Sequence, residues 1–320
     1  SATMRTAGEE FAMALHLAGL APVWDAGSGR VSGVEVVSLA LLGRPRIDVT
    51  LRVSGLFRDV FPALAALFET GAAALAERGE APEDNPYHHR AARVFGPRPG
   101  QYGLGMGVAM EDFTAEARAA AGEAWIAASG WAIGADGLSR ADRAGLEARL
   151  RGADSFVHAQ DLPESDLLLA ADYAAHEAGF AAALARLGAA KPALYHLDAT
   201  GPERPRARTL TEEIARVVRA RAANPAWADG MMAHGFRGAA EIAATLDHLA
   251  AFAHLAGVVP AHLFDLYHDA TLGRDAVVAF MSRENPAALQ ALHDLFARLR
   301  DAGLWVTRRN AIAATLEAPQ

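Results

Sequence analysis

Short apolar runs alternate with stretches of helical periodicity over the first two hundred residues, and this alternation limits the possible folds more than any other feature. Strand, helix and strand repeated in this way are typical of a parallel sheet with helices on its faces. We therefore predict an α/β fold with a largely parallel, doubly wound sheet. The expected strands are Val34–Leu39, Ile47–Val53, Ala92–Phe95, Ser155–His158 and Ala193–Leu197. The expected helices are Phe61–Arg78, Thr114–Ser129 and Leu168–Leu187.

The pattern changes after Thr200. A segment rich in proline and arginine, residues 201–208, leads into a region with helical periodicity and no convincing strand. Thr211, followed by two glutamates, is expected to begin the first helix, because a hydroxyl cap and early acidic residues favour a helix N-terminus. We predict a domain boundary near residue 201. It separates an α/β domain, residues 1–200, from a mostly helical C-terminal region, residues 201–320.

Charge and composition exclude several classes of protein. The net charge of -8 argues against a nucleic-acid-binding protein, which usually has a basic domain. The N-terminus lacks the pattern of a signal peptide, and no apolar run is long enough to cross a membrane. With no cysteine, the chain has no thiolate nucleophile and no disulfide. We expect a cytoplasmic protein.

The chain has a single lysine, Lys191, and this bears on ATP chemistry. A P-loop needs a lysine followed by serine or threonine after a glycine-rich turn, whereas Lys191 stands between alanine and proline. If the reaction uses ATP, we expect another chain to hydrolyse it.

Polar residues follow four of the expected strands, at the point where each ends. In doubly wound sheets, ligands bind beyond the carboxyl ends of the strands. One polar residue after a strand is common, so only the coincidence of several at one edge indicates a site. The strand ends carry an arginine–aspartate pair, a tyrosine in a glycine-rich loop, a three-residue cluster and a lone aspartate: Arg58 and Asp59; Tyr102; His158, Gln160 and Asp161; and Asp198.

The helix after the His158 cluster adds two further candidates. His176 lies four residues after Asp172, on the apolar face of the expected helix, and Glu177 points about a quarter-turn away. A histidine on an apolar face is often a core residue bonded to a neighbour. A histidine whose ring is hydrogen-bonded to a carboxylate can also be a metal ligand or a general base, because the carboxylate fixes the tautomer and orientation of the ring.

Arginines are dense in one stretch, which contains Arg204, Arg206 and Arg208. The structural interpretation is that these arginines are solvated surface residues that form ion pairs with nearby glutamates. The functional interpretation is that unpaired arginines bind the carboxylates of an anionic ligand.

Several long segments resemble one known family. Residues 43–61, 95–103, 208–221, 224–227 and 234–238 are similar, in order, to the signatures of the large subunits of cobaltochelatase and magnesium chelatase. Residues 158–166, 172–177 and 195–198 look like the cobalt branch. The family's large subunit is several times longer than this chain, so the resemblance implies a fragment from its C-terminal part.

The resemblance implies ATP-driven insertion of Co²⁺ into hydrogenobyrinic acid a,c-diamide, on the route to cobalamin (vitamin B12). Co²⁺ is then the substrate metal. ATP and Mg²⁺ are expected on two partner subunits of the AAA+ motor type, and the fragment alone should be inactive. The candidate residues then divide into three roles. The catalytic residues are His176, Glu177 and Asp198; the tetrapyrrole-binding residues are Arg58, Asp59, Tyr102, Gln160, Arg204, Arg206 and Arg208; and the metal ligands, expected around one cleft, are His158, Asp161, His176 and Asp198.

Three alternatives remain open from the sequence. The chain could act in the magnesium branch, on protoporphyrin. It could be a non-catalytic fragment that supports the subunit and docks the motor. It could also be an unrelated metal hydrolase built on His158, Asp161, His176 and Asp198.

Overall fold

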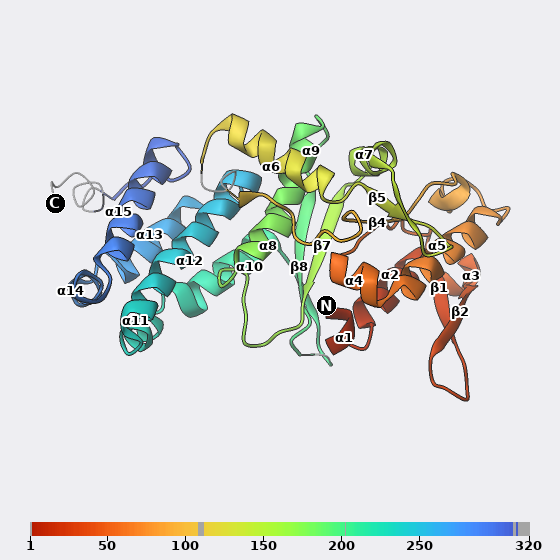
Figure 1. Cartoon of the computed structure of the whole chain (residues 1–320), viewed down its shortest axis with the longest axis horizontal. Helices are drawn as coiled ribbons and strands as arrows, with labels where there is room; N and C mark the ends of the chain where they lie inside the picture. Colours follow the sequence, from red (N-terminus) through yellow and green to blue (C-terminus); the bar gives the residue numbers. More distant parts are fainter. Residues whose placement is uncertain (1, 108–111, 202, 310–311, 313–320) are drawn as a thin grey trace. The chain divides into compact units, whose positions relative to one another are not determined.

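The computed structural model describes residues 2–107, 112–201, 203–309 and 312, and the chain forms two compact units (Figure 1). The first unit contains Ser1–Gly105 and Ala124–Ala153, and the second contains Met106–Glu123 and Asp154–Gln320. Helix α6 (Ala115–Ala127) begins in the second unit and ends in the first. The boundary expected near residue 201 therefore falls inside the second unit, which combines the last sheet with the helical region.

The first unit contains two small sheets. The strands β1 (Leu20–Trp24) and β2 (Val31–Val36) form an antiparallel hairpin. The second sheet has the order β3-β4-β5-β6, in which only the first pair is parallel. Its strands are β3 (Leu51–Arg52), β4 (Val94–Gly96), β5 (Trp131–Ile133) and β6 (Ser139–Ala141). The helices of this unit are α1 (Ala2–Arg5), α2 (Glu9–Ala18), α3 (Leu39–Leu42), α4 (Gly55–Val60), α5 (Pro62–Ala76), the 3-10 turn η1 (Pro86–His88) and α7 (Arg143–Arg151).

Helix α5 organises the core of the first unit. Pro62 begins it, where a missing N–H costs nothing and the fixed φ suits a helix. Its buried face packs with Phe11 and Leu15 of α2 around Phe68. Gly71 lets α5 approach the hairpin, because a Cβ there would lie 2.5 Å from Leu20 Cδ1.

The second unit contains a three-stranded sheet. The strands β7 (Ser155–Gln160) and β8 (Ala193–Asp198) are parallel, and β9 (Arg206–Thr209) pairs antiparallel with β8. The crossover between the parallel strands is one interrupted helix, formed by α8 (Ala171–Tyr173), a π-helical turn η3 (Ala174–Ala178) and α9 (Gly179–Arg186). This crossover positions the candidate site.

Helices make up the rest of the second unit. Thr209 caps the first of them in a capping box with Glu212, two residues before the start that we expected at Thr211. The later helices pack against one another, with α12 in contact with α11, α14 and α15 (Figure 1). They are α10 (Leu210–Val217), the π-helical turn η4 (Val218–Ala222), α11 (Pro225–Met232), α12 (Gly235–Ala256), α13 (Ala261–Ala270), α14 (Asp275–Glu284) and α15 (Pro286–Asp301).

The predicted α/β class and the helical C-terminal region are confirmed. The sheet differs from the prediction, because the strands form three small sheets rather than one largely parallel, doubly wound sheet. Among the strands of the described residues, only β3–β4 and β7–β8 are parallel. Two strands that the prediction omitted, Ser139–Ala141 and Arg206–Thr209, are short and polar, so their sequences carry little strand signal. The omitted strands Leu20–Trp24 and Trp131–Ile133 are apolar but short.

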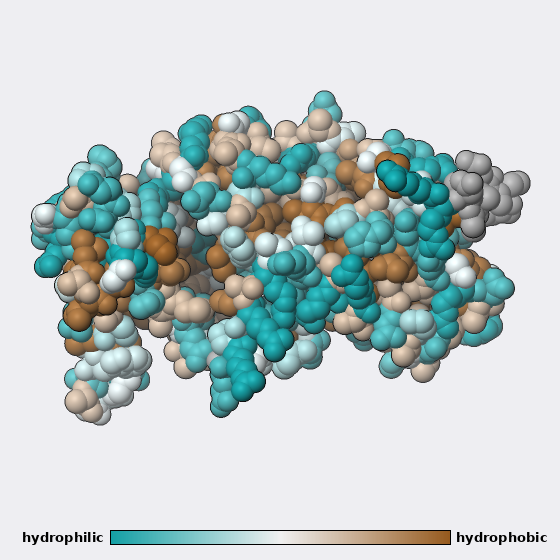
Figure 2. Space-filling view, turned by 180° about the vertical axis from the view of Figure 1, so that it is seen from behind, coloured by the Kyte–Doolittle hydropathy of each residue, from teal (hydrophilic) through white to brown (hydrophobic). Residues whose placement is uncertain are grey.

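The surface carries both hydrophilic and hydrophobic areas (Figure 2). On the sheet of the second unit, Val157 and Tyr195 are exposed on the face opposite the crossover helix. Within the described ranges, no helix is both long and apolar enough to cross a membrane.

Candidate active site

Two histidines lie side by side on the parallel strands of the second unit. The register of β7 and β8 places His158 opposite His196, and Gln160 opposite Asp198. Side chains alternate between the faces of a strand, so these four residues share the face that the crossover helix covers. His196 is fully buried and Gln160 nearly so, whereas the His158 side chain keeps 30% of its surface exposed.

Glu177 joins the two histidines. Its side chain is buried, and Oε1 lies 2.8 Å from Nδ1 of His158 and 2.8 Å from Nδ1 of His196. Burial alone would raise the pKa of Glu177, but the hydrogen bonds and charges of the two imidazoles outweigh this, and the pKa lies below its usual value. Glu177 is therefore a carboxylate that accepts two imidazole N–H groups.

The π-helical turn η3 explains why Glu177 occupies this position. A π-turn inserts one residue into the helix and rotates the residues that follow it. Glu177 is therefore buried and His176 partly exposed, the reverse of the arrangement expected from 3.6-residue periodicity.

Gln160 holds the second ring nitrogen of His196. The side-chain amide of Gln160 donates to the backbone oxygens of Leu162 and Ser165, so Oε1 is the atom that faces Nε2 of His196, at 2.9 Å. An amide oxygen only accepts hydrogen bonds, and so does a carboxylate. Oε1 of Gln160 and Oε1 of Glu177 therefore face the two ring nitrogens of His196 and hold this buried ring in place.

His158 is the member of this network that remains accessible. Its Nδ1–H donates to Glu177, which leaves the lone pair of a neutral ring on Nε2. No hydrogen bond among the described residues uses this Nε2. The rings of Tyr173 and His176 flank His158, with centroids 5.7 Å and 5.6 Å from its own. Burial raises the pKa of Tyr173.

Asp198 is turned toward a separate network of charges. It accepts hydrogen bonds from the backbone and hydroxyl of Thr200, and Arg208 lies 3.5 Å away. Arg208 also bonds to buried Glu213, which pairs with Arg216. Burial would raise the pKa of Asp198, but the bonds from Thr200 and Arg208 hold it below its usual value.

The sequence of this chain matches a known protein family. The model of the CobN/Magnesium Chelatase family matches residues 1–312. The chain belongs to this family.

Individual relatives agree with this membership. The chain is 42% identical to the aerobic cobaltochelatase subunit CobN of a Sinorhizobium species, over 97% of the chain and 26% of that relative. It is 28% identical to the chloroplastic magnesium-chelatase subunit ChlH of Oryza sativa subsp. japonica, over 95% of the chain and 23% of the relative. The catalytic subunit of cobaltochelatase from Mycobacterium tuberculosis matches with a TM-score of 0.90 at 33% identity, over 98% of the chain and 28% of that structure. The chain thus spans about a quarter of the length of these family members.

The structure brings together four of the predicted site residues of this chelatase-family chain: His158, Gln160, His176 and Glu177. Gln160 is bonded to His196, which it helps to position. Asp161 follows β7 and contributes to the field around Tyr173. Within the described part of the chain, no three His, Asp or Glu side chains are arranged to hold a metal ion.

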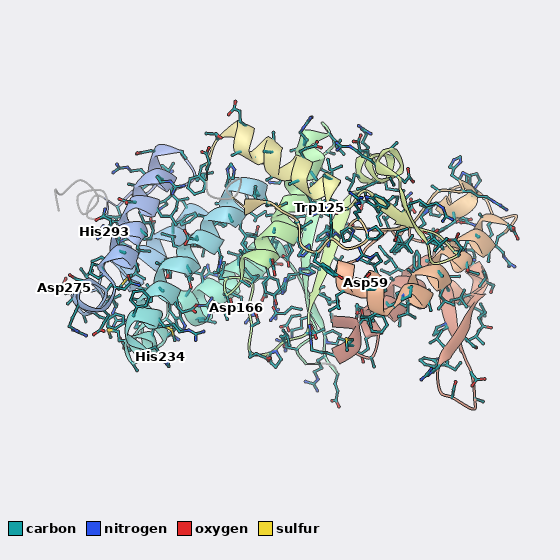
Figure 3. The ribbon with its side chains drawn as sticks, in the orientation of Figure 1. Asp59, Trp125, Asp166, His234, Asp275 and His293 are labelled. Carbon is teal, nitrogen blue, oxygen red and sulfur yellow. The ribbon has the colours of Figure 1, made fainter. Side chains whose placement is uncertain are left out.

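The predicted tetrapyrrole-binding residues fall into three groups. Arg204 and Arg206 are exposed, whereas Arg208 is held by Glu213. Arg58, Asp59 and Tyr102 belong to the first unit. There Arg58 is buried and donates to Asp59 and to the backbone oxygens of residues 97 and 98, while Tyr102 donates to Asp59, which is labelled in Figure 3. These contacts fix the loop that carries Tyr102.

His196 and Tyr173 were missed by the sequence analysis. Alignment of Ser155–Gln160 with Ala193–Asp198 as neighbouring parallel strands would have placed His196 beside His158. Asp166, which is labelled in Figure 3, was also overlooked. It lies in the loop between β7 and α8 and accepts hydrogen bonds from Arg221 of η4. Nothing in the spacing of these two residues indicates that pair.

Proposed function

We propose that this chain is part of the large subunit of a cobaltochelatase, where it contacts hydrogenobyrinic acid a,c-diamide and supports ATP-driven insertion of Co²⁺. Two AAA+ partner subunits hydrolyse the ATP. The higher identity to a cobaltochelatase subunit, 42% against 28% for a magnesium-chelatase subunit, favours the cobalt branch.

The observation that carries the proposal is the partly exposed His158 imidazole held by the buried carboxylate of Glu177. Insertion must remove two pyrrole protons from the ring and strip water from the metal. Imidazoles suit both tasks near neutral pH, because they accept protons and bind borderline divalent ions.

The candidate residues then take different roles. His158 and His176 are the imidazoles that meet the substrate, and His176 accepts ring protons. Glu177 acts through His158 and is a positioning residue. Arg204 and Arg206 bind acidic side chains of the ring. The participation of Asp161 and Asp198 as metal ligands stays a prediction.

Reconstitution tests the proposal. The whole large subunit is combined with both motor subunits, ATP, Co²⁺ and the corrin precursor, and the cobalt product is followed by its absorption. Glu177→Gln should lower the insertion rate by about 10- to 100-fold, the usual effect of removing the partner of a ligating histidine. Glu164→Gln, on an exposed residue of the loop after β7, is the control. Insertion by Glu177→Gln at the parental rate would contradict the proposal.

A further inference from the structure

We propose that His158 is an axial ligand of the cobalt ion: its Nε2 coordinates the metal from one face of the macrocycle while the four ring nitrogens hold it in the plane. This inference rests on the proposed function and deepens it, because it separates His158 from the residues that accept protons.

The hydrogen bonds of the site prepare His158 for this role. Nδ1–H is held by Glu177 at 2.8 Å, so the ring presents the lone pair of Nε2. Histidine ligands usually donate their second N–H to a carboxylate, which fixes the ring and makes it more basic.

Glu177 is itself held firmly. The same Oε1 is bonded to His196, whose other ring nitrogen is bonded to Gln160, and the Gln160 amide donates to the backbone of the loop after β7. This chain of bonds runs from the backbone to the accessible ring, so the orientation of His158 is set before any ligand arrives.

The surroundings of His158 suit a flat ligand with a metal at its centre. The imidazole is partly exposed, and the neighbouring rings of Tyr173 and His176 offer apolar contact area beside it. Cobalt(II) accepts imidazole nitrogen readily. The step is a ligand exchange: the bond between cobalt and Nε2 forms, a bound water leaves, and no proton or electron is transferred.

An axial donor favours the product of insertion. Nε2 binds the ring only when the metal is present, so it stabilises the metallated macrocycle and leaves the metal-free ring unaffected. By the same argument, His158 should increase the affinity for the cobalt corrin and not for its precursor.

Electron paramagnetic resonance can detect the bond directly. The unpaired electron of a low-spin cobalt(II) corrin points along the axial direction, so an axial ¹⁴N splits each parallel hyperfine line into a triplet. The cobalt(II) complex of hydrogenobyrinic acid a,c-diamide is added without oxygen to the whole large subunit. We expect triplets with the parent protein and doublets after labelling with ¹⁵N-histidine.

Variants assign the signal to one residue. His158→Ala should lose the splitting, and free imidazole should restore it, which a merely structural role would not predict. His176→Ala, the neighbouring imidazole, should keep the splitting. Glu177→Gln should weaken binding of the cobalt corrin by about 10- to 100-fold, with little change for the metal-free precursor.

The outcomes separate this inference from the proposed function. If the precursor binds but the parent protein shows no nitrogen splitting, the axial assignment is wrong and the proposed function stands. Splitting that survives in His158→Ala and disappears in His176→Ala would assign the ligand to His176 and overturn the inference. If neither corrin binds the whole subunit, the proposed function fails and this inference fails with it.

Discussion

Buried carboxylates hold pairs of basic side chains at two places in the second unit. Glu177 accepts from His158 and His196, and Glu213 accepts from Arg208 and Arg216. Removing one partner of a buried ion pair leaves an uncompensated charge, which costs far more than the intact pair gains. These residues therefore fix the geometry of β8, β9 and the helices that follow them.

The first unit offers a test of the same principle at Glu80. Its carboxylate pairs with the guanidinium of Arg46, whose side chain is fully buried. Glu80→Gln should lower the free energy of unfolding at pH 7 by about 3 kcal/mol. Glu77→Gln is the control, because Glu77 pairs with Arg90 at the exposed surface, and it should cost less than about 1 kcal/mol. Urea unfolding measures both.

The pH dependence of the Glu80 effect has a definite sign. The hydrogen bond from Arg46 holds the pKa of Glu80 below its usual value. A carboxyl group whose pKa is lower in the folded state stabilises the protein above the unfolded pKa of about 4.3, and this contribution is lost as the pH falls through the folded pKa. The difference between the parent and Glu80→Gln should therefore shrink as the pH is lowered from 5 to 3. A difference that stays constant over this range would contradict the assignment.

Arg206 is the residue through which ligand recognition is best tested. It is exposed at the start of β9, whereas Arg208 is already paired with Glu213. Arg206→Gln should weaken binding of the corrin precursor by about 1.5–3 kcal/mol and reduce its salt dependence. Arg237→Gln, on an exposed residue of α12, should change neither. Unchanged affinity in a folded Arg206→Gln protein would return Arg206 to the role of a solvated surface residue.

At the level of elements, the long periodic segments were predictable from the sequence. The helix expected at Phe61–Arg78 is α5, and the strands expected at Ser155–His158 and Ala193–Leu197 are β7 and β8. The π-turns were not predictable, because a hydrophobic pattern with a period of 3.6 residues contains no signal for a single inserted residue. His176 was therefore assigned to the buried side of the helix and Glu177 to the rim, the reverse of what the structure has.

The helix after the π-turn depends on a close approach that a single methyl group should disturb. A Cβ on Gly122 of α6 would lie 2.4 Å from the backbone oxygen of Ala182 in α9. Gly122→Ala should therefore destabilise the second unit by about 1–3 kcal/mol, although alanine favours a helix. Gly230→Ala in α11 is the matched control, because a Cβ there would meet nothing within 4 Å, and it should stabilise by up to about 1 kcal/mol. Equal stabilisation by both changes in urea unfolding would show that α6 and α9 do not pack as described.

At the scale of the whole molecule, the sequence indicated which parts of the chain are mainly helical better than it indicated where one compact unit ends and the next begins. The expected change from mixed strands and helices to mainly helices near residue 201 is present, since helices follow β9. The β8–β9 pairing and the bonds from Arg208 to Asp198 and Glu213 nevertheless tie the two sides of this point together. Such long-range pairing leaves no local signal, and for the same reason the sequence did not place Asp198 beside Arg208.

The choice between the cobalt and magnesium branches is also a property of the whole subunit, and ligand binding decides it. Hydrogenobyrinic acid a,c-diamide carries more carboxylates than protoporphyrin, so it can use the exposed arginines at residues 204 and 206 more fully. One additional charge-assisted hydrogen bond contributes about 1.5–3 kcal/mol, and 1.4 kcal/mol corresponds to tenfold in affinity. The whole subunit should therefore bind the corrin precursor at least about tenfold more tightly than protoporphyrin, with a steeper dependence on salt, in a fluorescence-quenching titration. Equal or tighter binding of protoporphyrin would favour the magnesium branch. Binding of neither ligand would leave this chain with a supporting role in the subunit, because residues that never meet the ring cannot assist metal insertion directly.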